Sequence, residues 1–225
     1  HSGAKIIFLN ENLLLDSGID RKMHHDKVKI IPNGVDEDLF SNVNDKKIHE
    51  IIFSGNLQRF NEGRGLDFVI NTFLNKNMPE ECRLKIIGGP SSEVKKLKEH
   101  VSELGLTNKI TFLGRLDRNS TISNIEKGGI GLLINSSKNL HSINYSSPLK
   151  YFEYLFAELK IVGIDFPSHR ALPFAENISF FNENNEESFI NAIKNASRSK
   201  TLKRTELKSI TMDSRIREII SLINK

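Results

Sequence analysis

Residues 146–154 of this 225-residue chain read SSPLKYFEY, a segment that joins a helix start to two charged side chains. Ser147 is expected to be the N-cap and Pro148 the first helical residue, because both types are favoured there. The free amides and partial positive charge of a helix start bind anions. Lys150 falls in the first turn, where a cation opposes the helix dipole unless an anion is bound nearby. The segment therefore predicts an anion site.

Glu153 follows Lys150 by three residues, so both side chains project near the same end of this helix. A carboxylate there can accept hydrogen bonds from two adjacent ribose hydroxyls. The alternative is an i,i+3 ion pair on the surface, worth only a few tenths of a kcal/mol. The two residues alone leave both interpretations open.

A glycine-rich loop at residues 55–65 follows an apolar run. Gly55, Gly63 and Gly65 would let the backbone approach a ligand closely. Arg64 stands at the mouth of the next predicted helix, where its guanidinium could clamp a phosphate through two hydrogen bonds. The alternative is a flexible loop that carries a surface arginine.

Two more loops follow predicted strands. In the first, Gly88 and Gly89 precede Ser91 and Ser92, either of which could cap a helix. In the second, residues 114–116 read Gly-Arg-Leu, and their backbone could face a planar base. Each loop is a weak signal by itself.

The elements that position these loops alternate along the chain. We expect strands at 5–9, 28–31, 50–54, 83–88, 110–112, 130–134, 160–163 and 178–181, and helices at 66–73, 93–104, 122–127, 149–157 and 187–196. This alternation predicts an α/β protein with a Rossmann-like, doubly wound parallel sheet and helices on both faces. Ligands bind beyond the carboxyl ends of the strands in such sheets.

Both ends depart from the alternation. Residues 197–225 read as a C-terminal helical tail, with isoleucines along one face from Ile216 to Ile223. Residues 5–18 resemble one strand–helix unit of something larger, and residues 1–3 read as an expression remnant. The turn at 32–34, Pro-Asn-Gly, breaks the chain. Asp36, Glu37 and Asp38 read as a helix start rather than as a metal-binding pair.

The composition is that of an ordinary globular protein, with 38% hydrophobic and 27% charged residues and a net charge of +4. No apolar run reaches the roughly 20 residues of a membrane-spanning helix. The single cysteine, Cys82, excludes an internal disulfide and favours a reducing compartment. Basic clusters at 21–22, 95–98 and 198–208 are interpreted as solvated helix faces, with an anionic ligand or membrane surface as the alternative. Nucleic acid is not expected as a partner.

Six motifs together resemble the C-terminal domain of family-4 (group 1) glycosyltransferases, which have the GT-B fold. They are IIPNGVD at 30–36, FSGNL at 53–57, RGLD at 64–67, LKIIGGP at 84–90, ITFLG at 110–114 and SPLKYFEY at 147–154. The resemblance runs from about Lys5 to the end. Any one motif is weak, but their order and spacing make the resemblance specific.

The resemblance assigns roles to individual residues. Arg64 takes the position of a basic residue on the donor diphosphate, and Glu153 that of the second glutamate of the E-x7-E motif, which holds the ribose. Lys150 belongs to a variant form of that motif, SPxKxxEY. Arg64 and Lys150 are the expected catalytic residues. The expected donor-binding residues are Gly55, Asn56, Arg64, Gly88, Arg115, Leu116, Tyr145, Ser146, Ser147, Pro148, Leu149, Lys150 and Glu153.

Two positions depart from the family pattern. Asn56 stands where the family usually has its first phosphate-binding arginine, and relatives that act on surface polysaccharides share this change. Tyr145 stands at the first glutamate, so the sugar contact there is either absent or supplied by a neighbour such as Asn144. The histidines, including the pair His24-His25, are expected at the surface. His141 is the one in a candidate site loop and could contact the donor sugar.

The implied reaction is retaining transfer of a sugar from a UDP- or GDP-linked donor to a glycan or lipid-linked acceptor, in surface polysaccharide synthesis. No cofactor or metal is expected. The resemblance divides the chain into a remnant of the N-terminal acceptor domain (1–27), a nucleotide-sugar-binding domain (28–211) and a crossover helix (212–225). With the acceptor domain missing, we expect donor binding without transferase activity. The location implied is the cytoplasm, in reach of the inner membrane face. The alternatives are a non-catalytic nucleotide-binding module and a GT-B nucleotide-sugar epimerase.

Overall fold

The computed structural model describes residues 4–20, 22, 24, 26–41, 46–59 and 62–224. Residues 1–3, Arg21 and His25, which entered the expectations above, lie outside the described residues. The described part of the chain confirms the α/β architecture, and it differs from the sequence-based prediction mainly at helix starts and in the tail.

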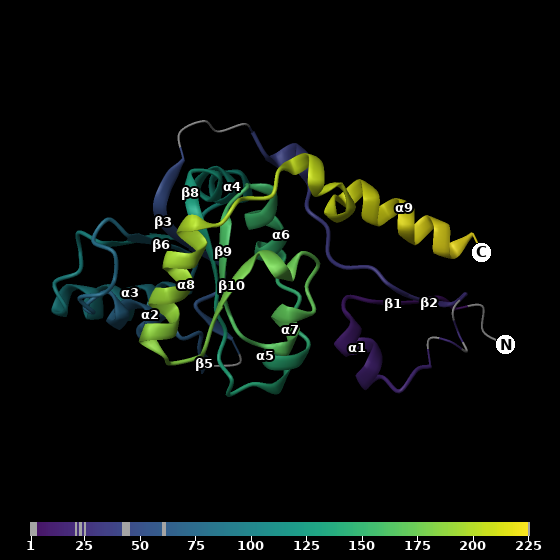
Figure 1. Ribbon diagram of the computed structural model, residues 1–225, viewed down its shortest axis with the longest axis horizontal. Coiled ribbons are helices and arrows are strands. Elements are labelled where there is room, and N and C mark those ends of the chain that lie inside the picture. Colours follow the sequence, from purple (N-terminus) through teal and green to yellow (C-terminus); the bar gives the residue numbers. More distant parts are fainter. Residues whose placement is uncertain are drawn as a thin grey trace.

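A six-stranded parallel sheet forms the centre, in the order β10-β9-β8-β3-β6-β7 (Figure 1). Within this sheet the chain passes first through β3 and then outward through β6 and β7. It then continues on the other side of β3 through β8, β9 and β10. Strand order thus reverses beside β3, which is where doubly wound sheets bind ligands. The strands are β3 (Lys47–Ser54), β6 (Arg83–Ile87), β7 (Ile110–Gly114), β8 (Gly128–Leu133), β9 (Lys160–Ile164) and β10 (Ile178–Phe181).

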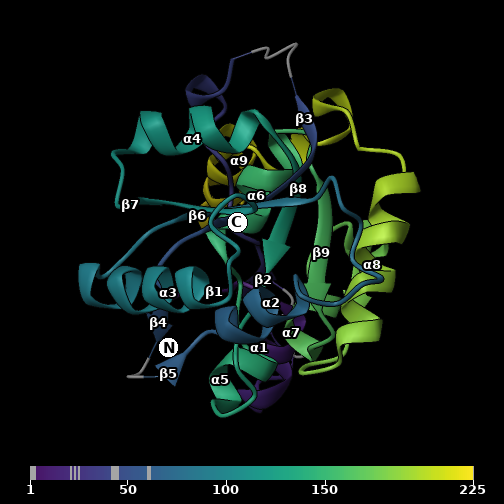
Figure 2. The ribbon, with the colours of Figure 1, turned by 90° about the vertical axis from the view of Figure 1, so that its left-hand side faces the viewer.

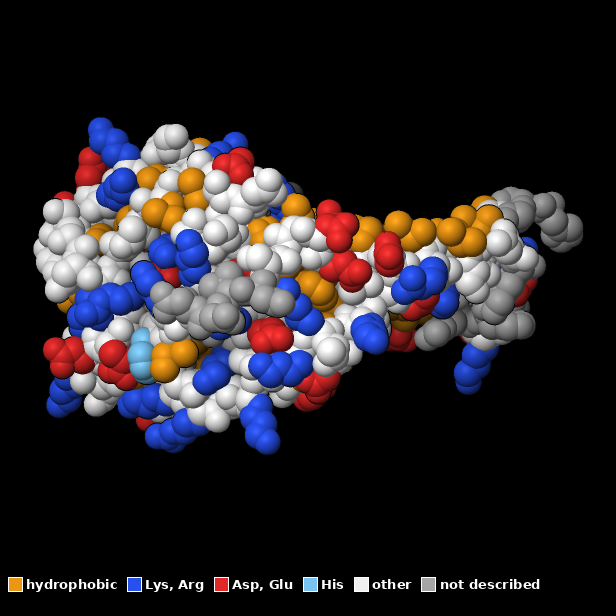
Figure 3. Space-filling view, turned by 90° about the horizontal axis from the view of Figure 1, so that it is seen from above, with side chains coloured by type: hydrophobic (Ala, Val, Ile, Leu, Met, Phe, Trp, Pro, Cys, Tyr) orange, Lys and Arg blue, Asp and Glu red, His pale blue; other side chains and the backbone are white. Residues whose placement is uncertain are grey.

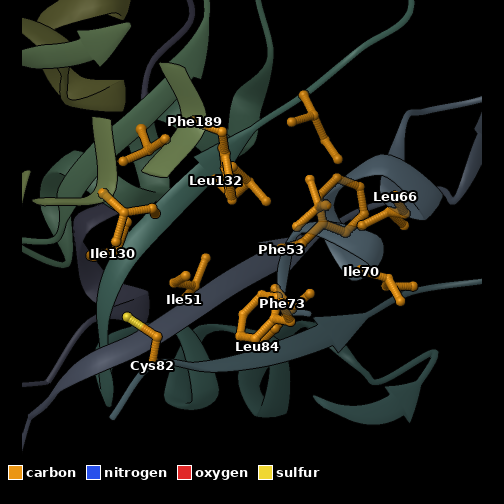
Figure 4. Packing of buried hydrophobic residues seen from close by; sticks show 14 of the residues in the cluster. Ile51, Phe53, Leu66, Ile70, Phe73, Cys82, Leu84, Ile130, Leu132 and Phe189 are labelled. Atoms are coloured by element: carbon orange, nitrogen blue, oxygen red, sulfur yellow. The ribbon is translucent and has the colours of Figure 1, made fainter. Parts of the chain in front are cut away.

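Helices cover both faces of the sheet, as predicted. On one face, Ile51, Phe53 and Leu132 pack against Leu66 of α2 and Phe189 of α8 (Figure 4). On the other face, the apolar side chains of α4 and α6 meet Ile52 and Leu133. The helices are α2 (Leu66–Thr72), α3 (Ser91–Glu103), α4 (Arg118–Glu126), α5 (Leu140–Asn144), α6 (Leu149–Phe156), α7 (Pro167–Arg170) and α8 (Glu186–Arg198). Burial on two faces explains why the central strands are continuous apolar runs.

Two predicted helix caps are wrong. Pro148, not Ser147, is the N-cap of α6, and Leu149 is its first residue. Pro90 precedes α3, so neither Ser91 nor Ser92 caps that helix. In both cases the proline stands one position earlier than a helical N1 residue would, because its extended backbone (ψ 125° and 166°) already belongs to the incoming loop. Asp36 does cap a helical turn, but only the single 3-10 turn η1 (Glu37–Leu39).

The tail is helical only at its end, in α9 (Met212–Ile223). Before it, the chain makes two 3-10 turns, η3 (Arg204–Glu206) and η4 (Lys208–Ile210), rather than the predicted helix. Tertiary contacts explain the difference: Leu207 and Ile210 are buried in the core of the second face. The Arg204 side chain donates to the carbonyl of Phe156 at 2.9 Å and to the carboxylate of Glu126 at 2.9 Å.

A small N-terminal unit lies beside this domain. Strand β1 (Ile6–Phe8), helix α1 (Glu11–Asp16) and strand β2 (Val28–Ile30) form a separate two-stranded parallel sheet with its connecting helix. Helix α9 runs out toward the same side of the molecule (Figure 1), and Lys29 pairs with Glu218 at 3.0 Å. Apolar side chains line the exposed side of α9 (Figure 3), among them Ile216, Ile220 and Ile223. The division of the chain at residues 27 and 211 stays a prediction.

The chain crosses between the two parts twice, and the crossings are bonded together. The Val35 amide donates to the Ile210 carbonyl at 2.8 Å, and the Met212 amide donates to the Val35 carbonyl at 2.8 Å. The Arg215 guanidinium donates to the carbonyl of Pro32. The linker and the start of α9 therefore form one connected piece.

The loops that follow β3, β6 and β7 are joined by backbone hydrogen bonds. The Gly55 amide donates to the Ile87 carbonyl at 2.9 Å, and the Gly88 amide donates to the Gly114 carbonyl at 2.8 Å. Gly88 has a φ of +146°, and a Cβ there would stand 1.8 Å from the Gly55 carbonyl oxygen. Only glycine permits this approach of the two loops.

Gly88→Ala should therefore lower the free energy of unfolding by roughly 2 kcal/mol or more, through both steric overlap and backbone strain. Urea denaturation measures the loss. Gly63→Ala is the matched control, since nothing lies within 4 Å of a Cβ placed there. Equal losses in the two variants would show that the contact between the loops is unimportant.

Candidate nucleotide-sugar site

The predicted loops meet at one edge of the sheet, beyond the carboxyl ends of the strands. In Figure 2 the arrows of β8 and β9 run down toward this edge, where α2 and α5 lie. Gly65, just before α2, approaches the loop after β8, because a Cβ on Gly65 would lie 4.0 Å from the Asn135 carbonyl oxygen. The head of α6 reaches the end of β3, where Lys150 Nζ lies 4.0 Å from the centre of the Phe53 ring.

Lys150 is buried in the head of α6, with only 9% of its surface exposed. Its Nζ makes no hydrogen bond to any described residue. Instead it sits over the face of Phe53, a cation–π arrangement when the amine is charged. Burial and the nearby Arg64 guanidinium hold the pKa of Lys150 well below its ordinary value, and Glu153 acts in the opposite direction. A buried amine without hydrogen bonds is unfavourable, so the position is prepared for an anionic partner.

Glu153 lies one turn further along α6 and is 5% exposed. Its carboxylate accepts a hydrogen bond from Arg118, the first residue of α4, whose side chain is 51% exposed. The sequence left open an interpretation of Lys150 and Glu153 as a surface ion pair. That interpretation is wrong. Helix α6 is buried from Lys150 to Phe156, so the i,i+3 pair of Lys150 and Glu153 faces the interior.

The backbone at the start of α6 is fixed by the linker. The Asn33 side-chain amide donates to the Ser147 carbonyl at 2.9 Å and to the Ser147 hydroxyl at 3.3 Å. Ser146 is buried, Leu149 is exposed, and Pro148 offers no side-chain cap to the amides of the first turn. These amides and Lys150 therefore stand together at the edge of the sheet, which suits an anion.

Arg64 and Lys150, the two expected catalytic residues, are brought together. Arg64 is half-buried and close enough to Lys150 for its charge to lower the pKa of that amine. Gly55 and Asn56, in the loop after β3, are both exposed. On the β7 side, the exposed Arg115 side chain lies against Gly89, where a Cβ would stand 2.9 Å from Arg115 Nε. Leu116 is half-buried against the core of the second face.

Tyr145 turns toward the N-terminal unit. Its hydroxyl donates to Asp16 of α1 at 2.6 Å, and this hydrogen bond raises the pKa of Tyr145. Asn12 donates to the Asn144 carbonyl at 3.0 Å, and the His141 ring meets the Tyr145 ring edge-on at 5.9 Å. The side chains of this corner thus connect α5 with α1, and a contact of Tyr145 or His141 with a donor sugar stays a prediction.

His169 is a residue that the sequence reasoning missed. It is 0% exposed, so the expectation that the histidines lie at the surface is wrong for this one. The ring is held by a 2.8 Å hydrogen bond between Nδ1 and the Ile164 carbonyl, which requires the proton on Nδ1. Burial lowers the pKa of His169 to about 4. Residues 165–169 follow β9 directly. Because ligands bind beyond the strand ends in such sheets, this position of His169 was a signal in the sequence.

Three further observations concern metal binding, membrane spanning and Cys82. Within the described ranges, no group of three or more His, Cys, Asp or Glu side chains is arranged to hold a metal ion. The same part of the chain contains no helix long and apolar enough to cross a membrane. Cys82 is buried, which raises the pKa of its thiol to about 11. Operation without a metal stays a prediction.

Sequence comparison decides the family. A profile of the group 1 glycosyl transferases matches residues 48–199, the greater part of the chain. The chain belongs to the group 1 glycosyltransferases. Among curated protein sequences, none matches this glycosyltransferase significantly.

Solved structures share the fold of this glycosyltransferase at low sequence identity. They include HepE from Anabaena in complex with UDP (13% identity, TM-score 0.70, 98% of this chain and 64% of that one). A sucrose-phosphate synthase from Thermosynechococcus elongatus matches with 13% identity and a TM-score of 0.68 (97% and 57% covered). A glycosyltransferase from Rickettsia africae matches with 14% identity and a TM-score of 0.68 (99% and 63% covered). The present chain spans less than two thirds of the length of each.

Lys150→Met should stabilise this glycosyltransferase when no ligand is present, by about 1–3 kcal/mol at neutral pH, because methionine removes the need to bury an amine. The unfolded chain binds a proton at Lys150 below about pH 10.4, whereas the folded chain, with a lowered pKa, resists it. Stability of the parent protein is therefore lost as pH falls from about 10 toward 7, and the advantage of methionine grows.

Urea denaturation at these two pH values measures the effect. Lys95→Met is the control, since that side chain is 80% exposed on α3, and no change is expected from it. A Lys150→Met variant less stable than the parent at neutral pH would show that the buried amine is well satisfied in the empty protein.

Proposed function

We propose that this chain binds a nucleoside-diphosphate sugar at the edge of the sheet and presents it for retaining transfer. The observation that carries the proposal is the buried, hydrogen-bond-free amine of Lys150, which lies with Arg64 beside the uncapped head of α6. Two cationic side chains and a helix N-terminus form a site for a diphosphate. The family membership supports the same ligand class.

The ribose and the base of the donor would contact residues next to the diphosphate site. The ribose would lie on Glu153, whose position is fixed by Arg118, and the base against the backbone at Arg115 and Leu116. As the glycosidic bond breaks, negative charge grows on the β-phosphate, and the diphosphate ligands named above stabilise it without a metal. HepE, a structural relative, has been solved with UDP and with UDP-glucose, which favours a UDP-linked donor here.

The proposal also includes the class of acceptor. A glycan or lipid-linked acceptor in surface polysaccharide synthesis fits Asn56, the change that relatives of this kind share. A lipid-linked acceptor would bring the protein to the cytoplasmic membrane face. The chain spans less than two thirds of its structural relatives, and donor binding is the part of the proposal that it can test directly.

A second candidate is a nucleotide-binding module of the same fold without catalysis. It is favoured by Tyr145, which stands where the family has a glutamate and whose hydroxyl is engaged by Asp16. Both candidates bind nucleotide, and they separate on turnover: only the first hydrolyses or transfers sugar when it is assayed together with an acceptor-binding domain.

Calorimetry with UDP, GDP and ADP tests nucleotide binding, which both candidates share. If none of the three nucleotides binds, the proposal is wrong. Glu153→Gln should weaken the binding of the preferred nucleotide roughly tenfold to a hundredfold, because hydrogen bonds from the ribose to a charged acceptor are lost.

Glu126→Gln is the matched control for this variant. Glu126 is also a buried carboxylate, paired with Arg204 at 2.9 Å, but it lies at the far end of α4. Both variants should lose similar stability, and only Glu153→Gln should lose affinity. Equal affinity in the two variants would reduce Glu153 to a structural partner of Arg118.

A further inference from the structure

We propose that the protein takes up one proton when it binds a nucleotide sugar, and that the Lys150 amine receives it. The inference rests on the proposed function and adds the protonation state of that site before and after binding. In the empty protein Lys150 is a neutral amine, and in the complex it is an ammonium ion.

Among the described residues, Lys150 Nζ meets the face of an aromatic ring and has no hydrogen-bond partner. Phe53 of β3 lies 4.0 Å away, and no described residue gives or accepts a hydrogen bond at this nitrogen. A cation–π contact stabilises an ammonium ion far less than hydration does. Geometry alone therefore disfavours the charged form while the site is empty.

The charged and titratable groups that face Lys150 do not make its charged form favourable. Arg64, from the loop before α2, is a cation and repels an ammonium ion. Glu153, from α6 itself, is a nearby anion, but its carboxylate is hydrogen-bonded to Arg118 of α4. His169, from α7, is enclosed by protein and neutral. Burial and Arg64 together outweigh Glu153, in agreement with the lowered pKa of the lysine.

A nucleotide sugar reverses the balance. Its diphosphate carries two negative charges, and these phosphates do not titrate near neutral pH, so the ligand itself supplies no proton. An anion beside a buried amine favours the charged form. The amine then gains a proton from the buffer, R–NH2 + H⁺ → R–NH3⁺, and no bond to the ligand forms or breaks. The new ammonium ion faces the phosphate that becomes the leaving group, where a positive charge is most useful.

Calorimetric titration of the chain with UDP-glucose at about pH 8, in HEPES and in Tris, measures the proton count. These buffers differ in ionisation enthalpy, so the change in observed heat gives the protons taken up per ligand. We expect close to one proton, and an affinity that falls about tenfold per pH unit across the range where uptake is complete.

Three variants assign the proton. Lys150→Arg keeps a permanent charge, so its titration should show near-zero uptake and an affinity independent of pH. His169→Gln removes the buried imidazole near Lys150 and should retain the full uptake. Lys138→Met, which removes an exposed lysine paired with Glu62 at the same edge, should retain it as well. Loss of uptake in His169→Gln would overturn the assignment to Lys150.

The results also separate this inference from the proposed function. Firm binding of UDP-glucose with the same heat in both buffers would overturn the proton uptake and leave nucleotide-sugar binding in place. If UDP-glucose, GDP-glucose and ADP-glucose all fail to bind, the proposed function falls and the inference falls with it.

Discussion

The burial of α6 from Lys150 to Phe156 is the constraint on which the rest of this structure depends. The helix lies against β3 and β8, and the Ser54 amide donates to the Tyr154 hydroxyl at 2.8 Å. Gly131 of β8 has no side chain because the Tyr154 ring occupies that space, where a Cβ would stand 2.3 Å from it. A helix held this closely carries its first turn inward, and Lys150 goes with it. The buried amine is thus a consequence of how α6 packs, and its chemistry follows from that placement.

The same helix also links the site to the rest of the chain. Its incoming residue, Ser147, is held by Asn33 of the linker, and the linker is bonded in turn to the start of α9 through Val35. Any movement of the N-terminal unit relative to the sheet would act first on this connected piece. The residues proposed to bind the diphosphate and those that join the two parts of the chain therefore share one set of hydrogen bonds.

The two departures from the family pattern acquire different meanings in the structure. Asn56 is exposed in the loop after β3, open to whatever ligand occupies the edge. Tyr145 is instead committed to Asp16 at 2.6 Å, in a corner where Asn12 also reaches Asn144. The position that carries a glutamate in relatives thus serves here to connect α5 with α1.

The sequence by itself determined the parallel sheet, the loops beyond its strands and the family, because apolar runs and glycines report local backbone needs that hold in any context. It also located Arg64, Lys150 and Glu153 in one site, since their neighbours in the chain carry the motifs. Only the tertiary structure decided that Pro148 caps α6, that Arg118 is the partner of Glu153, that residues 204–210 form two 3-10 turns, and that His169 is buried beside Lys150. These outcomes depend on which side chains from distant segments meet and how much water is excluded when they do, and that information is absent from the local pattern.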